Sequence, residues 1–366
     1  MDIKIKLFKR FLLLWIGEFI STIGSGLTSF GFGIYVFEQT GKTSAMALVT
    51  LIGFLPLVIL SPIAGVFADR YDRRLLMVLG DSLSVIGLFF ILICMLTGEA
   101  QLWQICLGVG ISSIFSSLVD PAYRATVTDI LTEDQYAKAS GFVQMAGAAK
   151  FLISPALAGV LLKIADIKHI VILDMATFFV TVFTALAVRR SIPKKVNLKA
   201  NGQKKDTFMT EIKEGWNAIT KKSGVLILVV MSSLLSFFIG FIQTLAVPMI
   251  LAFESSLVAG VMETIMAVGM LISSILISVF SIKGGYLKVL SGSVLGSGIF
   301  MVLFGLTENV LLISIAGFLF FTTLPFASTS LDCLVRTNID GAIQGRVWGF
   351  IGVISQGGFI VAYGLS

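Results

Sequence analysis

The chain has 366 residues, of which 56% are hydrophobic and 13% are charged, and its formal net charge is +6. Soluble domains carry about 25% charged residues, so this composition, with a mean hydropathy of +0.98, excludes an ordinary soluble protein. A helix of about 20 apolar residues crosses a bilayer. Segments of that kind predict an all-α polytopic membrane protein with eleven spans, at 11–37, 44–68, 75–97, 102–123, 140–163, 169–189, 224–251, 257–280, 287–306, 310–331 and 347–366.

The N-terminal segment carries basic residues ahead of an apolar stretch, as a secretory signal does. The apolar stretch continues to about Val36, however, and no clear cleavage site of small residues follows it. A signal core is shorter than this. We therefore expect an uncleaved first span, preceded by Lys4, Lys6, Lys9 and Arg10.

The basic residues are distributed unevenly over the two sides of the membrane. If the N-terminus is cytoplasmic and the spans alternate, all 27 Lys and Arg residues except Lys42, Lys150, Lys163 and Lys168 fall in cytoplasmic segments. Basic loops stay in the cytoplasm as a rule. The distribution predicts a multi-pass protein of the plasma membrane with a cytoplasmic N-terminus. It also explains the net charge without a nucleic-acid partner.

The residues that usually carry enzyme chemistry are sparse. Cys94, Cys106 and Cys333 are far apart, and His169 is the only histidine in the sequence. Zinc sites and nucleophile–base pairs need several such residues in set spacings. We expect no metal, no cofactor, no catalytic residue and no enzymatic activity.

A polar stretch divides the spans into two groups. It predicts a six-helix N-terminal lobe at 1–190, a cytoplasmic linker at 191–223 and a C-terminal lobe of about five helices at 224–366. The first half of the linker, to Asp206, is rich in lysine and is expected to be mobile. The second half predicts an amphipathic helix on the membrane surface or on the bundle, since its apolar residues recur at helical spacing: Phe208, Ile212, Trp216 and Ile219.

One decapeptide between the second and third spans is unusually informative. Residues 65–74 read Gly-Val-Phe-Ala-Asp-Arg-Tyr-Asp-Arg-Arg, a cluster of charge between two apolar runs. Together with further short motifs, the sequence resembles the major facilitator superfamily, and more narrowly its macrolide-efflux branch of drug exporters, a group that also resembles siderophore exporters. The further motifs are Phe54–Pro56, Asp120–Ala122, Ser154–Gly159, Glu211–Gly215, Gly269–Ile272 and Gly345–Val347.

The resemblance implies a fold of two six-helix lobes, and the chain departs from that pattern in three places. The superfamily has twelve spans, so we expect a truncated or incompletely represented polypeptide that lacks the last one. Asp72 stands where the superfamily usually has Gly. Ser112 stands where many proton-coupled exporters carry an Arg, which puts the usual proton relay in doubt.

The resemblance also implies a gate around Asp69, near the start of span 11. A helix N-terminus attracts a carboxylate, and Arg346 at that start can add an ion pair. We expect Asp69 to hold the lobes together on the cytoplasmic side until the inner side opens, with Gly65 permitting close helix contact. The alternative is that these charges only set topology. The gating set is Gly65, Asp69, Arg70, Arg73, Arg74, Gly345 and Arg346.

Ionisable residues within the spans form a second set of candidates, because an unpaired charge there is costly. Glu18 in span 1 and Lys150 in span 5 are expected to face a common cavity and pair. Glu18 then carries protons, unless the pair is a fixed structural one or both groups are solvated lining. Asp174 and Glu263 lie nearer the outer surface, where a structural role is equally expected.

Two further features concern the transport path. Ser154, Pro155 and Gly159 resemble an exporter motif in span 5, where proline bends a helix and small residues allow close packing. Gln243 and Pro248 in span 7 are candidates for the substrate cavity, since polar groups and helix breaks at membrane depth face protein or water.

These observations predict a secondary active exporter of amphipathic small molecules such as macrolides, working by alternating access with proton antiport. An exporter of a siderophore or a peptide-like metabolite is the first alternative. A non-transporting receptor or assembly protein on the same scaffold is the second. The expected partners are a small-molecule substrate, protons and membrane lipids, and we expect a monomer.

Overall fold

The computed structural model describes residues 2–191, 207–306 and 308–365, and over these ranges it contains helices and turns without a strand. Eleven of its helical segments are long and apolar enough to cross a membrane. This agrees with the predicted all-α fold of eleven spans. The lysine-rich part of the linker at 192–206, which we expected to be mobile, lies outside the described residues.

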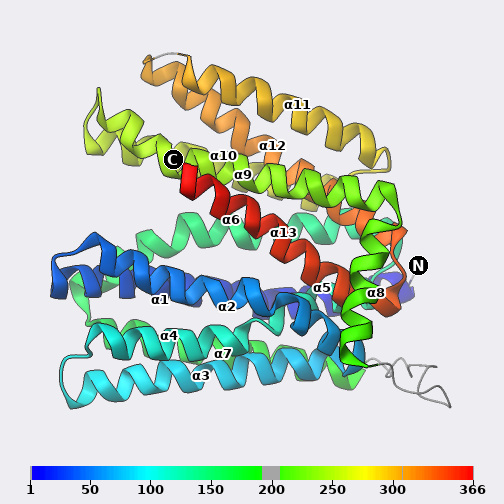
Figure 1. The fold of residues 1–366 in the computed structure, drawn as a ribbon, viewed down its shortest axis with the longest axis horizontal. Coiled ribbons are helices and arrows are strands. Elements are labelled where there is room, and N and C mark those ends of the chain that lie inside the picture. Colours follow the sequence, from blue (N-terminus) through cyan, green and yellow to red (C-terminus); the bar gives the residue numbers. More distant parts are fainter. Residues whose placement is uncertain (1, 192–206, 307, 366) are drawn as a thin grey trace. The chain divides into compact units, whose positions relative to one another are not determined.

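The first half of the chain forms seven helices where six spans were predicted (Figure 1). The segment predicted as span 4 is broken at Ser117 and Leu118, because Pro121 lacks an N–H group and its ring would clash with the carbonyl of Ser117 in a continuous helix. The helices are α1 Asp2–Thr40, α2 Thr43–Arg70, α3 Arg73–Thr97, α4 Leu102–Ser116, α5 Val119–Ile130, α6 Glu133–Ile164 and α7 Ile167–Ser191.

The second half begins with the short helix α8, in the segment for which an amphipathic helix was expected. The turn between α10 and α11 is made by Gly284 and Gly285, whose φ angles of +78° and +65° suit glycine. The elements are α8 Phe208–Thr220, α9 Ser223–Leu251, α10 Ser256–Phe280, α11 Tyr286–Gly305, α12 Val310–Asn338, the 3-10 turn η2 Gly341–Ile343 and α13 Gln344–Leu365.

Contacts group the described chain into two compact units. The first unit holds residues 1–131, 153–218 and 340–352, and the second holds 132–152, 219–339 and 353–366. Helix α6 and helix α13 therefore each contribute to both units. The expected division into lobes at 190 and 224 remains a prediction.

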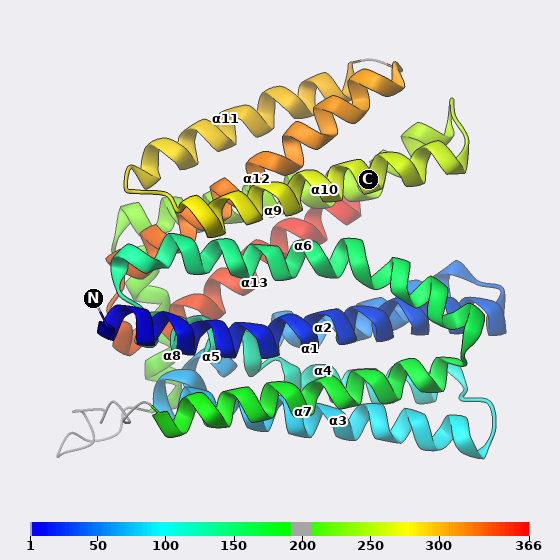
Figure 2. The ribbon, with the colours of Figure 1, turned by 180° about the vertical axis from the view of Figure 1, so that it is seen from behind.

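Within the first unit, α1 packs along α7, and α3 packs against α4 and α7 (Figures 1 and 2). Three glycines of α1 make the first contact close. They are spaced by seven residues, about two helical turns, and therefore share one face. A Cβ added at Gly24 would lie 2.5 Å from the Thr177 hydroxyl, and one at Gly31 would lie 2.6 Å from Ile167, while one at Gly17 would overlap Thr184. Small residues let membrane helices approach in this way.

Within the second unit, α12 is the central helix and packs against α11, α10 and α9. Figures 1 and 2 both show α11 and α12 side by side. Gly269 of α10 faces the carbonyl of Phe318, and a Cβ added there would lie 2.6 Å from it. Gly317 of α12 is covered by Met266 in the same way. Glycine thus sets the α10–α12 distance.

Candidate functional site

The best-defined polar site lies where the end of α2 meets the start of α13, inside the first compact unit. Gly65 of α2 faces the backbone of Gly345, so closely that an added Cβ would overlap the Gly345 carbonyl. One added at Gly345 would lie 2.6 Å from the Asp69 carboxylate. The two glycines therefore bring the α13 N-terminus onto the last turns of α2.

Asp69 caps the start of α13. Its Oδ1 accepts the backbone N–H of Gly345 at 2.8 Å, and its Oδ2 accepts that of Arg346 at 3.0 Å. The Asp69 side chain is fully buried, with 0% of its surface exposed. The first N–H groups of a helix have no partner within the helix and carry partial positive charge. A buried carboxylate at this point is therefore well satisfied.

Arg73 joins Asp69 to two other segments. Its Nη2 lies 3.0 Å from Oδ1 of Asp69, and its Nη1 lies 3.0 Å from Oδ2 of Asp129 on α5. Nη2 also donates to the carbonyl of Gly341 at 2.7 Å, and Nε donates to the carbonyl of Ala68 at 3.0 Å. A planar guanidinium can hold several acceptors at once. Arg73 therefore fixes α2, α5 and the turn before α13 together.

Arg346 links the same point to α8. Its Nη1 lies 2.6 Å from Oε2 of Glu214, its Nη2 lies 3.5 Å from Oε1 of Glu211, and its Nε lies 3.4 Å from Oδ2 of Asp69. Glu211 also pairs with Arg70 at 2.6 Å. We call this group the Asp69 cluster: Asp69, Arg70, Arg73, Asp129, Glu211, Glu214 and Arg346.

Aromatic contacts accompany the polar ones on α8. The ring of Trp216 lies 5.6 Å from that of Phe350 on α13, and the ring of Phe208 lies 5.8 Å from that of Phe67 on α2. The guanidinium of Arg70 lies 5.5 Å from the Phe208 ring. The apolar face of α8 thus packs on α2 and α13 of the same unit.

Asp72 has a role at the start of α3 that glycine cannot fill. It is the N-cap residue, and its side chain accepts the backbone N–H of Arg74 at 3.1 Å. Its Oδ2 also accepts Nε of Arg189 at 2.9 Å. Burial raises the pKa of Asp72, but the hydrogen bonds from Arg189 and Arg74 outweigh it, so the pKa lies below its ordinary value. Arg74 itself is buried.

A second polar site lies among α1, α3 and α7. Asp174 is 2% exposed, and Ser25 donates to its Oδ1 at 3.5 Å. Asp81 on α3 is 4% exposed, and its Oδ2 has no hydrogen-bond partner among the described residues. Both Glu18 and Asp174 act on Asp81 electrostatically. Three acidic groups are therefore gathered within this unit.

Sequence reasoning missed Asp81, although the signal was present. Asp81 follows Arg73 by eight residues and lies within the apolar run 75–97. The rule that selected Glu18, an ionisable group inside an apolar span, applies equally to Asp81. Asp332 and Arg336, both buried on α12, lie just beyond the predicted span 310–331, so this rule did not reach them.

The remaining intramembrane candidates are dispersed. Glu18 is half-buried in the first compact unit, whereas the half-buried Lys150 belongs to the second, so their pairing stays a prediction. Glu263 lies on an exposed face of α10.

The exporter-motif residues lie on α6. Ser154 is buried and donates to the carbonyl of Ile23 on α1 at 3.1 Å, so the residue that replaces glycine in the motif anchors two helices. Pro155 lies within the helix. Among the described residues, no atom outside the local helix backbone lies within 4 Å of a Cβ added at Gly159.

The cavity candidates lie on α9. Gln243 is half-buried, and Pro248 is exposed near the helix end.

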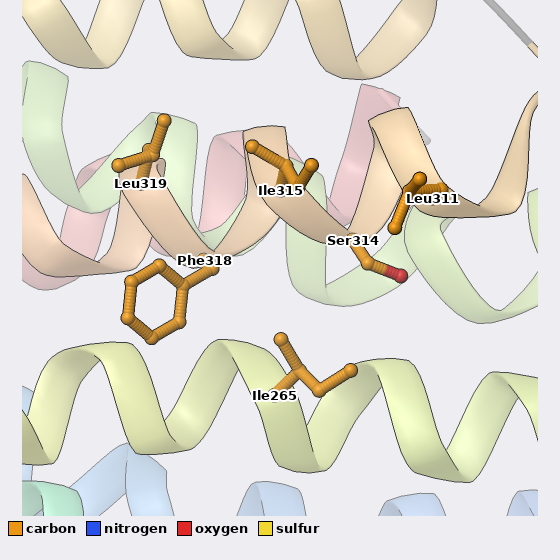
Figure 3. A pocket seen from close by; sticks show the side chains of 6 residues that line it. All are labelled: Ile265, Leu311, Ser314, Ile315, Phe318 and Leu319. Carbon is orange, nitrogen blue, oxygen red and sulfur yellow. The ribbon is translucent and has the colours of Figure 1, made fainter.

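An apolar hollow lies between α10 and α12 (Figure 3). Its volume is about 240 Å³, below the roughly 300–1,000 Å³ of typical ligand pockets. Phe318 and Ser314 project from α12 toward Ile265 on α10, and Leu311, Ile315 and Leu319 complete the lining. It contains none of the predicted site residues. Its chemistry suits apolar chains rather than a large polar drug.

The part of the chain that the structure describes contains no cluster of three or more His, Cys, Asp or Glu side chains arranged to hold a metal ion. The cysteines at 94, 106 and 333 are not joined in disulfides.

Eleven apolar helices, with a charged cluster where α2 meets α13, define a polytopic membrane protein of the transporter class. The profile of the Major Facilitator Superfamily matches residues 14–363. The chain therefore belongs to the Major Facilitator Superfamily.

Relatives of known name lie among bacterial efflux proteins. Macrolide efflux protein A of Streptococcus pyogenes is 28% identical over 357 residues, which covers 94% of this chain and 85% of that protein. Macrolide efflux protein A of Enterococcus faecalis is 28% identical over 324 residues, covering 85% of this chain and 97% of that protein.

Solved structures share the fold at low sequence identity. A bacterial homologue of the iron transporter ferroportin, in an outward-facing state, superposes with a TM-score of 0.71 at 15% identity, covering 97% of this chain and 91% of that one. The human organic anion transporter MFSD10 superposes with a TM-score of 0.71 at 12% identity, covering 97% and 93%. These likenesses establish the fold alone.

Proposed function

We propose that the protein is a secondary active exporter of amphipathic small molecules of the macrolide class, driven by proton antiport. The observation that carries this proposal is the similarity to macrolide efflux protein A along 94% of the chain. Members of one transporter family carry many different substrates, so the fold alone does not identify the substrate. Similarity along 94% and 85% of the chain to two proteins of one named activity therefore supports the substrate class.

The Asp69 cluster supports an alternating-access gate. Asp69 and Arg73 belong to the first half of the chain, whereas Gly345 and Arg346 belong to the second. The contact of Asp69 with the α13 N-terminus holds these two segments together, and its loss frees them. The hydrogen bonds that Asp69 accepts from Gly345 and Arg346 are 2.8 Å and 3.0 Å long, and the Asp69 side chain is fully buried, so the closed arrangement is well defined at this point. Opening breaks charge-assisted hydrogen bonds, which are stronger than neutral ones.

Helix α8 adds a second connection to the same gate. Glu211 and Glu214 contact Arg346, and Glu211 also contacts Arg70. Arg346 therefore interacts with both Asp69 and α8. In this proposal the linker helix stabilises the closed gate, and it does not merely lie on the membrane surface.

The coupling ion in this proposal is the proton, and Glu18 is its carrier. An ionisable group inside a membrane span is costly to keep there without a partner, which makes Glu18 a candidate for a functional role. The alternative role for Glu18 is a fixed pair with Lys150. The two differ in one result, since a fixed pair leaves transport proton-driven when Glu18 becomes Gln.

The orientation in this proposal has the N-terminus in the cytoplasm, following the basic residues. The Asp69 cluster then lies on the cytoplasmic side. The protein acts as a monomer in the plasma membrane, with lipids around its apolar faces.

Accumulation of labelled erythromycin in efflux-deficient cells tests the function. Cells that express the chain should accumulate less than cells with an empty vector, and a protonophore should restore accumulation. The matched control is Asp166→Asn, an exposed acid that pairs with Lys168 at 3.3 Å, which should export normally. Accumulation equal to that of the empty vector would refute the macrolide assignment. Export that a protonophore does not affect would refute proton coupling.

A further inference from the structure

The apolar hollow between α10 and α12 contains none of the residues to which the proposed function assigns a role. It is lined by Ile265 of α10 and by a stripe of residues on α12 (Figure 3). The stripe residues are spaced by three and four positions, so they share one face of the helix: Leu311, Ser314, Ile315, Phe318 and Leu319. From Leu311 to Leu319 the stripe is about 12 Å long, given a rise of about 1.5 Å per residue. The lining is therefore elongated along the helix axis.

Two glycines explain where the hollow begins. Gly269 of α10 lies against the carbonyl of Phe318, and Gly317 of α12 lies against a methionine of α10. These contacts draw the two helices together. About one turn earlier on each helix, Ile265 and Ser314 stand in place of glycine, and the hollow lies between them. A side chain at these positions prevents the close backbone approach that glycine permits.

The lining of the hollow is almost entirely apolar. Ser314 is the one polar side chain among the six that line it, and its hydroxyl already donates to the carbonyl of Val310 at 2.7 Å. Water needs several polar partners, and a cavity of about 150 Å³ lined by Leu, Ile and Phe stays dry and binds small apolar molecules. At about 240 Å³ this hollow is larger. Its chemistry and its size therefore favour an apolar ligand.

Both walls of the hollow belong to membrane spans, so the medium outside it is the hydrocarbon of the bilayer. The helices α10 and α12 contain the candidate spans Val258–Phe280 and Val310–Asn338. Leu311 is 68% exposed and Ile315 is 46% exposed, so the edge of the hollow on α12 faces outward. The hydrocarbon core is about 30 Å thick, of which one leaflet supplies about half. A stripe of about 12 Å therefore matches the length of a lipid chain within one leaflet.

We infer that this hollow is a binding site for one acyl chain of a membrane phospholipid. The chain lies along the α12 stripe, where its CH₂ groups contact Ile265, Ile315 and Phe318. The walls of an empty hollow lack contact atoms on one side, and the chain supplies them. A macrolide is a poorer occupant, because pockets for drug-sized ligands measure roughly 300–1,000 Å³. The site binds lipid whatever the protein exports, so this inference is independent of the proposed substrate and coupling ion.

Native mass spectrometry of the purified, delipidated full chain in detergent measures this binding. The probe is dioleoylphosphatidylcholine at increasing concentration, and the affinity of the first bound lipid is determined. Ile265→Trp should fill the hollow, since Ile265 points toward Ser314 and Phe318 (Figure 3). We expect this variant to weaken the binding by about tenfold or more, because excluding two CH₂ groups already corresponds to that factor. An unchanged affinity would overturn the site.

Two matched variants separate the hollow from the general lipid surface of the protein. Ile265→Val keeps the hollow open and should keep the tight binding. Leu295→Trp adds the same ring on α11, where Leu295 is 69% exposed and outside the hollow, and it should also keep the tight binding. An equal loss of binding in Leu295→Trp would overturn the assignment to the hollow.

A second filling variant keeps the test decisive if Ile265→Trp fails to fold. Ser314→Leu fills the hollow from α12 and should weaken the binding in the same way, and thermal unfolding verifies that each variant is folded. Dioleoylphosphatidylglycerol should give the same loss in each filling variant, because its acyl chains are identical. A loss that depends on the headgroup would overturn an acyl-chain site. Displacement of the lipid by equimolar erythromycin would also overturn it and would assign the hollow to the drug.

Discussion

The carboxylate of Asp69 lies 2.8 Å from the backbone nitrogen of Gly345, in a contact between residues 276 positions apart in the sequence. Gly65, one helical turn before Asp69, packs against the backbone of the same Gly345. A charged hydrogen bond and a close backbone contact therefore act at one point. The hydrogen bond attracts α13 to α2. The contact at Gly65 lets the two helix backbones come close enough for that hydrogen bond to form.

Replacing Gly65 with Ala should weaken this contact. The added methyl group would overlap the carbonyl of Gly345, and backbone atoms cannot move aside as a side chain can. Overpacking of this kind costs about 1–3 kcal/mol. We expect slower erythromycin export at equal protein level. Gly298→Ala is the control, because no described atom outside the local helix backbone lies within 4 Å of its added Cβ. Equal export by both variants would contradict a closed gate at Gly65.

Replacing Asp69 with Asn should impair the gate through charge. Asparagine is similar in shape, but it loses the attraction to Arg73, Arg346 and the positive end of α13. Removing one partner of a buried ion pair costs about 3–5 kcal/mol. We expect a large loss of export, measured as erythromycin accumulation. Unchanged export at normal expression would show that Asp69 has no role in gating and that the charges of this segment only set the orientation of the spans.

A double-mutant cycle should reveal the link between α8 and α13. Glu214→Gln and Arg346→Gln remove the two partners of a contact of 2.6 Å, whose side chains are 41% and 8% exposed. Groups in direct contact show coupling of about 0.5–3 kcal/mol. Thermal unfolding of the four proteins measures it. The exposed pair of Asp166 and Lys168 is the control, with coupling expected below about 1 kcal/mol. A coupling energy between Glu214 and Arg346 no larger than that of the control pair would show that α8 does not stabilise the closed gate.

The sequence was sufficient for the spans and for part of this cluster. Apolar runs of fixed length identify membrane helices, because the bilayer sets the length. The superfamily resemblance placed Asp69 beside Arg346, and the structure brings them within 3.4 Å. The break between α4 and α5 was missed, although Pro121 and Asp120 mark it, since an apolar run continues across it.

The acidic partners could not be read from the sequence. Glu211 lies 141 positions from Arg70, and Asp129 lies between the predicted spans 102–123 and 140–163. Charge complementarity gives the kind of partner but not its position along the chain. The position depends on how α5 and α8 pack, and one sequence carries no direct signal for that packing.

The glycine face of α1 gives a prediction about stability. Gly24→Ala would place a methyl group 2.5 Å from the Thr177 hydroxyl and 2.8 Å from the Asp174 carboxylate. We expect destabilisation of about 1–3 kcal/mol from overpacking, seen as a lower unfolding temperature in detergent. Gly298→Ala should instead be neutral. A Gly24→Ala protein as stable as this control would show that α1 and α7 are not held in close contact.

Asp72 makes two contacts that substitution can separate. Asparagine is as good an N-cap as aspartate, so Asp72→Asn should keep the hydrogen bond to Arg74 and lose only the pair with Arg189. Alanine should lose both. We expect a loss of about 0–1 kcal/mol for Asn, and roughly 1 kcal/mol more for Ala.

The pH dependence of stability follows from the same contacts. The pKa of Asp72 is lower in the folded protein than its ordinary value of 3.8. Its contribution to stability is therefore fully present above that value and is lost as the pH falls through the lower, folded pKa. The stability gap between the unchanged protein and Asp72→Asn should be constant near neutral pH and should close below about pH 4. Thermal unfolding in detergent across this range measures the gap. A gap that stays constant into strong acid would mean that the carboxylate charge of Asp72 contributes nothing to the junction of α3 and α7.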